Sequence, residues 1–138
     1  MLRKDYIQRK FEEFGKFLAL LVGFKQNNQW QELERQINEN SQKFSGVEIG
    51  AIEMISDPAL LIELTQVRGL KEEQLKILGD LLYEKGLAYT NLQRSFEAKN
   101  AFIKSKAIYE FIQQNSLEVD FSLDMHFKLK SIEQLLKD

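Results

Sequence analysis

Residues 79–112 read GDLLYEKGLAYTNLQRSFEAKNAFIKSKAIYEFI, and this stretch decides the fold. Apolar side chains recur in it at steps of three and four, the spacing of one face of an α-helix. The pattern breaks at residues 91–94, so the stretch predicts two helices, over about 70–92 and 95–114, joined by a turn. Small and bulky residues stand on the faces that would meet: Gly86, Ala98 and Ser105 are small, and Tyr89 and Phe102 are bulky. The two helices are therefore expected to approach closely.

The same stretch resembles one tetratricopeptide repeat, a helix–turn–helix unit of about 34 residues. Gly86 and Tyr89 stand at the small and tyrosine positions of its first helix. Ala98 and Phe102 stand at the alanine and aromatic positions of its second helix. The usual tryptophan, leucine, turn glycine and proline are replaced by Leu82, Lys85, Gln93 and Glu110. The resemblance implies antiparallel helical hairpins that bind other proteins.

A fainter copy of this unit lies 65 residues earlier in the chain. Leu21, Phe24, Leu33 and Ile37 stand where Gly86, Tyr89, Ala98 and Phe102 stand, and Asn28 stands where Gln93 stands. Because Leu21 replaces a small residue, the first pair is expected to pack more loosely or to cross at another angle.

The 138 residues suit one all-α domain of about five to seven helices. Its expected parts are a degenerate helix pair over 3–44, irregular short helices over 45–69, a tetratricopeptide-like pair over 70–114 and a C-terminal helix over 120–137. In the irregular part, Asp57 is expected to cap a helix that begins with Pro58. The glycines within predicted helices are expected to permit close packing: Gly15, Gly23, Gly79 and Gly86.

The whole chain also resembles a family of short bacterial proteins of unknown function. In that family, as in residues 1–7 here, an arginine and an Asp-Tyr pair lead into an apolar helix. Tetratricopeptide-like pairs and a C-terminal helix follow. This resemblance implies a shared fold and no particular activity.

Composition argues against several functions. The chain has no cysteine, which removes disulfides, thiolate metal sites and cysteine nucleophiles. His126 is the single histidine, and no catalytic or phosphate-binding motif occurs. Net charge is −2, whereas nucleic-acid binding depends on clustered lysine and arginine. We therefore expect no catalytic residues, no metal, no cofactor and no nucleic-acid partner.

The most apolar segment, residues 17–24, is shorter than the roughly 20 residues that span a bilayer. Acidic residues precede it and no small-residue cleavage site follows, so no targeting segment is expected. These features predict a cytoplasmic protein.

The leading functional hypothesis is a protein-interaction module, because ligands of tetratricopeptide proteins bind the first helix of each pair. By this resemblance, the candidate partner-binding residues are Asp80, Tyr83, Leu87, Thr90 and Asn91. The corresponding residues of the fainter copy are Gly15, Leu18, Val22, Lys25 and Gln26. The partner would be a helix or an extended peptide.

Two alternatives use the first helix. Its apolar segment could form a homodimer, through the candidate interface residues Phe17, Leu20, Val22 and Phe24. Alternatively, a basic side could place this helix on an anionic membrane, through Arg3, Lys4, Arg9, Lys10 and Lys16. The membrane alternative is the weaker one, because an amphipathic helix usually docks on its own domain.

Overall fold

The computed structural model describes residues 2–115 and 122–137, and every regular element in these ranges is helical. The elements are α1 (Leu2–Gln26), α2 (Trp30–Ser45), α3 (Ile49–Glu53), the 3₁₀ turn η1 (Asp57–Ala59), α4 (Leu60–Ile62), the π-helical turn η2 (Glu63–Val67), α5 (Glu72–Asn91), α6 (Ser95–Asn115) and α7 (Ser122–Lys137). The predicted all-α class is confirmed. The predicted C-terminal helix is α7, and residues 120–121 of that prediction lie outside the described ranges.

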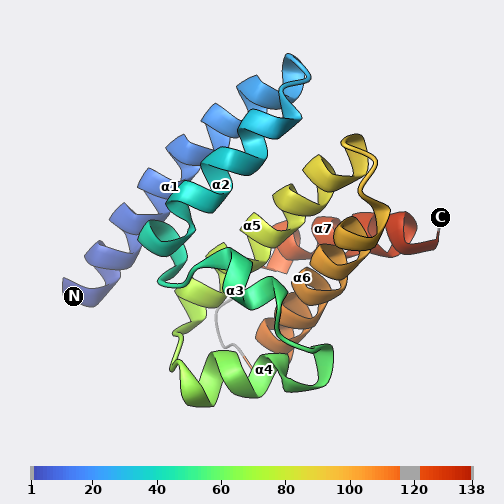
Figure 1. Ribbon diagram of the computed structural model, residues 1–138. Helices are drawn as coiled ribbons and strands as arrows, with labels where there is room; N and C mark the ends of the chain where they lie inside the picture. The colour runs from blue at the N-terminus through green and yellow to red at the C-terminus, as the bar shows by residue number, and fades with distance from the viewer. Residues whose placement is uncertain (1, 116–121, 138) are drawn as a thin grey trace.

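The α5–α6 pair forms the centre of the molecule, with α2 packed on α5 and α7 packed on α6 (Figure 1). Glycines let the two central helices approach, because Gly79 faces the ring of Tyr109 and Gly86 faces the ring of Phe102. The Ser105 hydroxyl donates a 2.8 Å hydrogen bond to the carbonyl of Gly79. The predicted packing of small residues against bulky rings is therefore confirmed for this pair.

The turns of the α1–α2 and α5–α6 pairs have the same backbone geometry. Asn28 and Gln93 both have positive φ, at 57° and 61°. The turn closes with Gln29 N–H donating to the Phe24 carbonyl at 2.8 Å in the first pair. In the second pair, Arg94 N–H donates to the Tyr89 carbonyl, also at 2.8 Å. Three more backbone hydrogen bonds recur at the same offset in both turns, so the fainter copy reproduces the turn of the clearer one.

Helix α1 packs on α2 through aromatic rings. Phe44 of α2 lies 5.5 Å from Phe14 and 5.1 Å from Phe17, measured between ring centroids. The other side of α1 is uncovered, since a Cβ added at Gly15 or Gly23 would meet no atom within 4 Å. The expectation that these two glycines permit close packing within the fold is therefore wrong, because no helix lies against that side.

The segment between the two pairs consists of short helical turns, with Ile49 and Ile52 buried. The expected capping role of Asp57 is wrong. Ser56 holds the cap position of η1, and no side chain caps this turn. Instead, the Asp57 carboxylate accepts a 2.9 Å hydrogen bond from Lys104 of α6. Asp57 thus fixes the segment on α6 and does not cap a helix.

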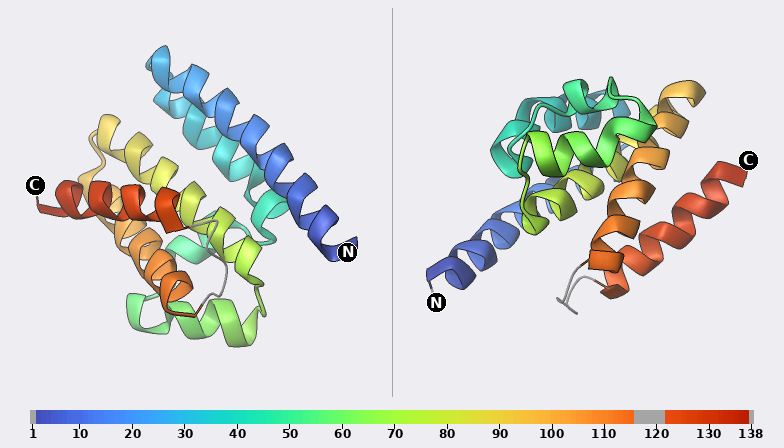
Figure 2. Two further views of the ribbon diagram at one scale, coloured as in Figure 1. Left: turned by 180° about the vertical axis from the view of Figure 1, so that it is seen from behind. Right: turned by 90° about the horizontal axis from the view of Figure 1, so that it is seen from below.

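Helix α7 crosses the side of the α5–α6 pair that faces the viewer in the left panel of Figure 2. Its apolar side chains are buried at Met125, Leu129 and Ile132, while Leu136 is half-buried. Because these side chains seal one side of the central pair, α7 belongs to the core of the fold.

Candidate functional site

The predicted partner face of α5 lies only partly on the surface. Thr90 and Asn91 are exposed, and Tyr83 and Leu87 are half-buried. Asp80 is 2% exposed, so the expectation that it would face a guest is corrected. The structure thus divides the candidate residues of α5 into an interior end and an accessible end.

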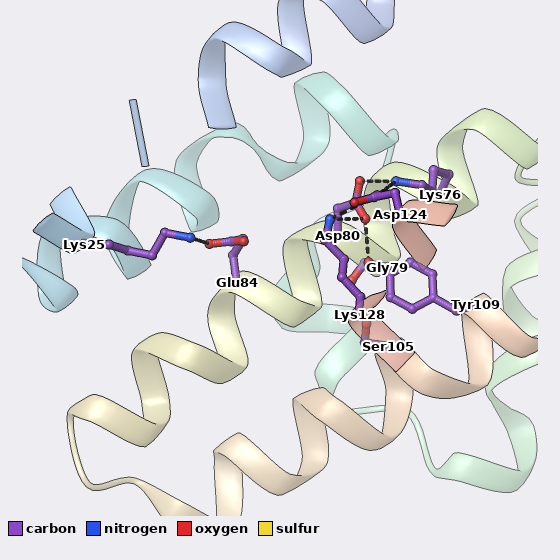
Figure 3. A network of polar contacts seen from close by, with 9 residues as sticks. All are labelled: Lys25, Lys76, Gly79, Asp80, Glu84, Ser105, Tyr109, Asp124 and Lys128. Atoms are coloured by element: carbon purple, nitrogen blue, oxygen red, sulfur yellow. Dashed lines mark hydrogen bonds and ion pairs between the residues drawn. The ribbon is translucent and has the colours of Figure 1, made fainter. Parts of the chain in front are cut away.

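Asp80 is buried because α7 lies across its end of α5 (Figure 3). Its Oδ1 accepts hydrogen bonds from the Tyr109 hydroxyl and from Lys128 Nζ, the latter at 2.9 Å. Its Oδ2 accepts from Lys76 Nζ at 2.7 Å. Lys76 also donates to Asp124 Oδ2 at 2.8 Å. Two lysines and two aspartates balance one another, and the hydroxyl of Tyr109 completes the cluster.

The ionisation of this cluster follows from its burial and its pairing. Burial alone would raise the pKa of Asp124, but hydrogen bonds and charges from Lys76 and Lys128 outweigh it and hold that pKa below its usual value. Burial alone would lower the pKa of Lys128, but the Asp80 carboxylate outweighs it and raises that pKa. Burial, reinforced by Asp80, raises the pKa of Tyr109 well above its usual value. Asp124 and Lys128 therefore stay charged, and Tyr109 stays protonated, at neutral pH.

A hydrogen bond outside this network also attaches α7 to α5. The hydroxyls of Tyr83 and Ser131 are 2.9 Å apart and share a hydrogen bond. Among the described residues, every buried side-chain nitrogen or oxygen has a hydrogen-bond partner. The network therefore holds α5, α6 and α7 together.

Ion pairs also tie α1 and α2 to the central pair. Lys25 of α1 lies 2.7 Å from Glu84 of α5, whose side chain is 8% exposed. Glu34 of α2 lies 3.0 Å from Arg94, in the turn after α5. These contacts fix how the first pair sits on the second.

Glu53 holds α3 on α5 in the same way. Its carboxylate accepts hydrogen bonds from Lys85 and, at 2.7 Å, from the Tyr89 hydroxyl. Burial first, and then the Glu53 carboxylate, raise the pKa of Tyr89. The ring of Tyr89 is also in cation–π contact with Arg94, whose guanidinium carbon is 4.6 Å from the ring centroid.

The candidate partner residues on α1 are more accessible than those on α5. Gly15, Val22 and Gln26 are exposed, and Leu18 is half-buried. Lys25 is bound to Glu84, as described above. The first-helix residues that a partner can reach are thus concentrated on α1 and at the end of α5.

The candidate dimer residues do not share one environment. Phe17 is 8% exposed and belongs to the core between α1 and α2, so its expected role at an interface is corrected. Phe24 is half-buried. Leu20 and Val22 are 48% and 43% exposed. Only the last two leave substantial apolar surface in contact with water.

Sequence reasoning missed the α7 network, although both helices carried a signal for it. Lys76 and Asp80 are four residues apart within an otherwise apolar run of α5. Asp124 and Lys128 have the same spacing on α7. Opposite charges four residues apart on a helix predict an ion pair between them. That two such pairs meet depends on how α7 crosses α5, which the spacing does not specify.

In residues 2–115 and 122–137, no three acidic or histidine side chains converge to hold a metal ion. No helix in the same ranges has an apolar stretch long enough to cross a bilayer.

The comparisons with known proteins leave the chain without an assigned family. Neither a protein-family model, nor a curated protein, nor a solved structure matches it.

Proposed function

We propose that this protein is a non-catalytic helical-repeat module that binds a helix or extended peptide of a partner protein along α1 and α5. The observation that carries the proposal is the repeated turn. Asn28 and Gln93 have the same left-handed conformation, and the same set of backbone hydrogen bonds surrounds each of them. This recurrence supports reading α1–α2 and α5–α6 as two copies of one unit, with α1 and α5 as equivalent first helices.

The resemblance to tetratricopeptide repeats supplies the rest of the argument. In those proteins the first helices of successive units bind the ligand. The Gly86–Phe102 and Gly79–Tyr109 contacts give the second unit here the close helix packing that such repeats need. We also propose that the chain shares its fold with the family of short bacterial proteins that it resembles, which carry tetratricopeptide-like pairs.

The accessible first-helix residues indicate the chemistry of the partner. Gln26, Thr90 and Asn91 supply uncharged polar groups, while Val22 and Leu87 supply aliphatic contacts. None of these side chains carries a charge. A partner segment with apolar and uncharged polar side chains therefore fits this face better than a terminal carboxylate or an acidic tail does.

Site-specific photo-cross-linking tests this proposal. A photoreactive residue at position 22 or 91 is expected to capture a defined partner from a native lysate. The same residue at Lys99, an exposed position on α6, is the matched control. The captured protein is then purified, and its affinity is measured for the wild type and for Val22→Glu, Asn91→Arg and Lys99→Glu.

We expect the first two substitutions to weaken binding about tenfold or more, since each places a charge against an uncharged surface. Lys99→Glu should leave the affinity unchanged. Equal labelling from position 99, or an affinity that none of the first-helix substitutions changes, would contradict the proposal.

A second candidate function, a homodimer through α1, is favoured by one observation. Leu20 and Val22 stay exposed, and Gly15 and Gly23 leave open space beside them. Exposed aliphatic side chains next to glycines let a second helix approach closely at this end of α1. Light scattering across a concentration series checks the candidate, because a dimer should dissociate in Val22→Glu but persist in Lys99→Glu. A wild-type protein that stays monomeric at high concentration rules it out.

A further inference from the structure

Arginines in this protein are paired with carboxylates, with one exception. Arg35 pairs with Glu32 and Glu39, Arg68 lies 3.5 Å from Glu63, and Arg94 pairs with Glu34 and Glu97. Arg9 alone, among the arginines whose side chains the structure describes, has no such partner. An unpaired guanidinium keeps all its donors available for an external anion.

Arg9 borders a surface hollow between α1 and α2. The hollow is lined by Tyr6, Arg9, Lys10, Glu13, Lys43 and Phe44. No carboxylate among the described residues forms an ion pair with Lys10 or Lys43 either. Three free cations thus surround one hollow, against the single carboxylate of Glu13.

Aromatic rings border the hollow and position its lysines. Lys43 Nζ lies 5.2 Å from the ring centroid of Phe44, which is 5% exposed. Lys10 Nζ lies 6.0 Å from the ring centroid of Tyr6. The apolar border that Phe44 supplies lowers the local dielectric, so an anion in the hollow interacts more strongly with the three cations than it would in open water.

We propose that this hollow, defined by Arg9, Lys10 and Lys43, binds the phosphate group of a phosphate monoester. This site is separate from the proposed partner face on α1 and α5, and it stands or falls independently of that proposal.

The charge balance selects phosphate over a carboxylate. Among the residues that line this hollow, three cations and one carboxylate leave two positive charges, which match a monoester phosphate that carries about −1.5 to −2 at neutral pH. Asp5 and Glu12 line a different hollow with Arg9. The planar guanidinium of Arg9 can bind two phosphate oxygens at once, and lysines act as point charges beside it. A monoanionic carboxylate would leave part of the positive charge uncompensated.

The phosphate has two possible sources, a soluble ester or the headgroup of an anionic lipid. Tyr6, Arg9, Lys16 and Leu20 recur at steps of three and four, which places them in one row on α1 together with Glu13. Tyr6 and Leu20 are 55% and 48% exposed. Tyr6 lines the hollow, and Leu20 adds apolar surface farther along the same row. A lipid source of the phosphate can therefore be tested directly.

Nuclear magnetic resonance titration of the full-length protein tests the site. Inorganic phosphate is added at neutral pH and constant ionic strength, with acetate as the monoanionic control. Shift changes should saturate and stay confined to residues 6–13 and 43–44, and acetate should produce weaker ones. Arg9→Gln and Lys43→Gln should each weaken phosphate binding about tenfold. Lys99→Gln, which removes an exposed lysine from α6, should not.

Vesicle co-sedimentation then separates the sources. Binding to phosphatidic acid vesicles but not to phosphatidylcholine vesicles, lost in Arg9→Gln, assigns the lipid headgroup. Phosphate shifts without vesicle binding assign a soluble ester. The proposal is overturned if the shifts do not saturate, if acetate matches phosphate, or if Lys99→Gln weakens binding as much as Arg9→Gln does. Arg9 and Lys43 are exposed, so replacing either one should leave the fold intact. Unchanged amide resonances away from the hollow will confirm that the variants are folded.

Discussion

The ring of Phe102 occupies the space that a side chain at Gly86 would need. A Cβ added at Gly86 would lie 2.5 Å from Cε1 of that ring. Because the ring is itself 2% exposed and packed in the core, it has little room to move. The closeness of α5 and α6 therefore depends on the absence of one methyl group.

Gly86→Ala should destabilise the protein. Overpacking a core costs about 1–3 kcal/mol, while alanine in a helix regains about 1 kcal/mol over glycine. We expect a net loss of up to about 2 kcal/mol in the free energy of unfolding, measured by urea denaturation.

Gly15→Ala is the matched control, because a Cβ at Gly15 meets nothing within 4 Å. This substitution should stabilise the protein by up to about 1 kcal/mol through helix propensity alone. If the two substitutions shift stability in the same direction, the packing account of Gly86 is wrong.

Replacing Asp80 should be far more costly than replacing Asp124. Asp80→Asn leaves Lys76 and Lys128 with an uncompensated charge in a buried site, at a cost of about 3 kcal/mol. The Asp124 side chain is 53% exposed, so water can replace its carboxylate and Asp124→Asn should cost under about 1 kcal/mol. Equal costs in denaturant unfolding would show that the cluster is not organised around Asp80.

The attachment of α7 should weaken at both extremes of pH. The folded pKa of Asp124 is lowered, so its stabilisation is present above the unfolded value of about 3.9 and is lost as pH falls through the folded pKa. The folded pKa of Lys128 is raised, so its stabilisation is complete below about 10.4 and is lost as pH rises through the folded pKa. Between these limits, α7 should stay docked.

The methyl resonance of Met125 reports this change, because Met125 lies on α7 and is 2% exposed. We expect it to move toward its unfolded position below about pH 4. Asp124→Asn should remove the acid dependence that Asp124 contributes. An identical acid profile in that variant would show that another carboxylate is responsible.

Tyr89 and Tyr109 should resist ionisation in the folded protein. Burial raises the pKa of both hydroxyls, and each donates a hydrogen bond to a carboxylate, Glu53 or Asp80, that would repel a tyrosinate. In an alkaline titration followed by tyrosinate absorbance, both should ionise only as the chain unfolds. Phenylalanine at either position should reduce the amplitude of that late step, and an unchanged amplitude would contradict the assignment.

The α5–α6 pair shows how far the sequence alone can lead. The spacing of Gly86, Ala98 and Phe102 predicted a tight helical hairpin, and the offset copy predicted a matching turn at Asn28. Both were confirmed because they depend on local periodicity and on pairs close in the chain. The assignment of Asp80 to the surface was wrong, because its burial depends on α7, which lies far along the chain.

The amino-acid sequence by itself determined the helices, the two related hairpins and the apolar stripe of each, since these follow from periodicity and from where the small residues fall. Tertiary structure alone decided which charges are buried, which glycines face a ring, and which side of α1 stays open. The physical reason is that burial depends on the relative placement of whole helices. Gly15 and Gly86 both lie within helices, and only the presence of a neighbouring ring distinguishes them.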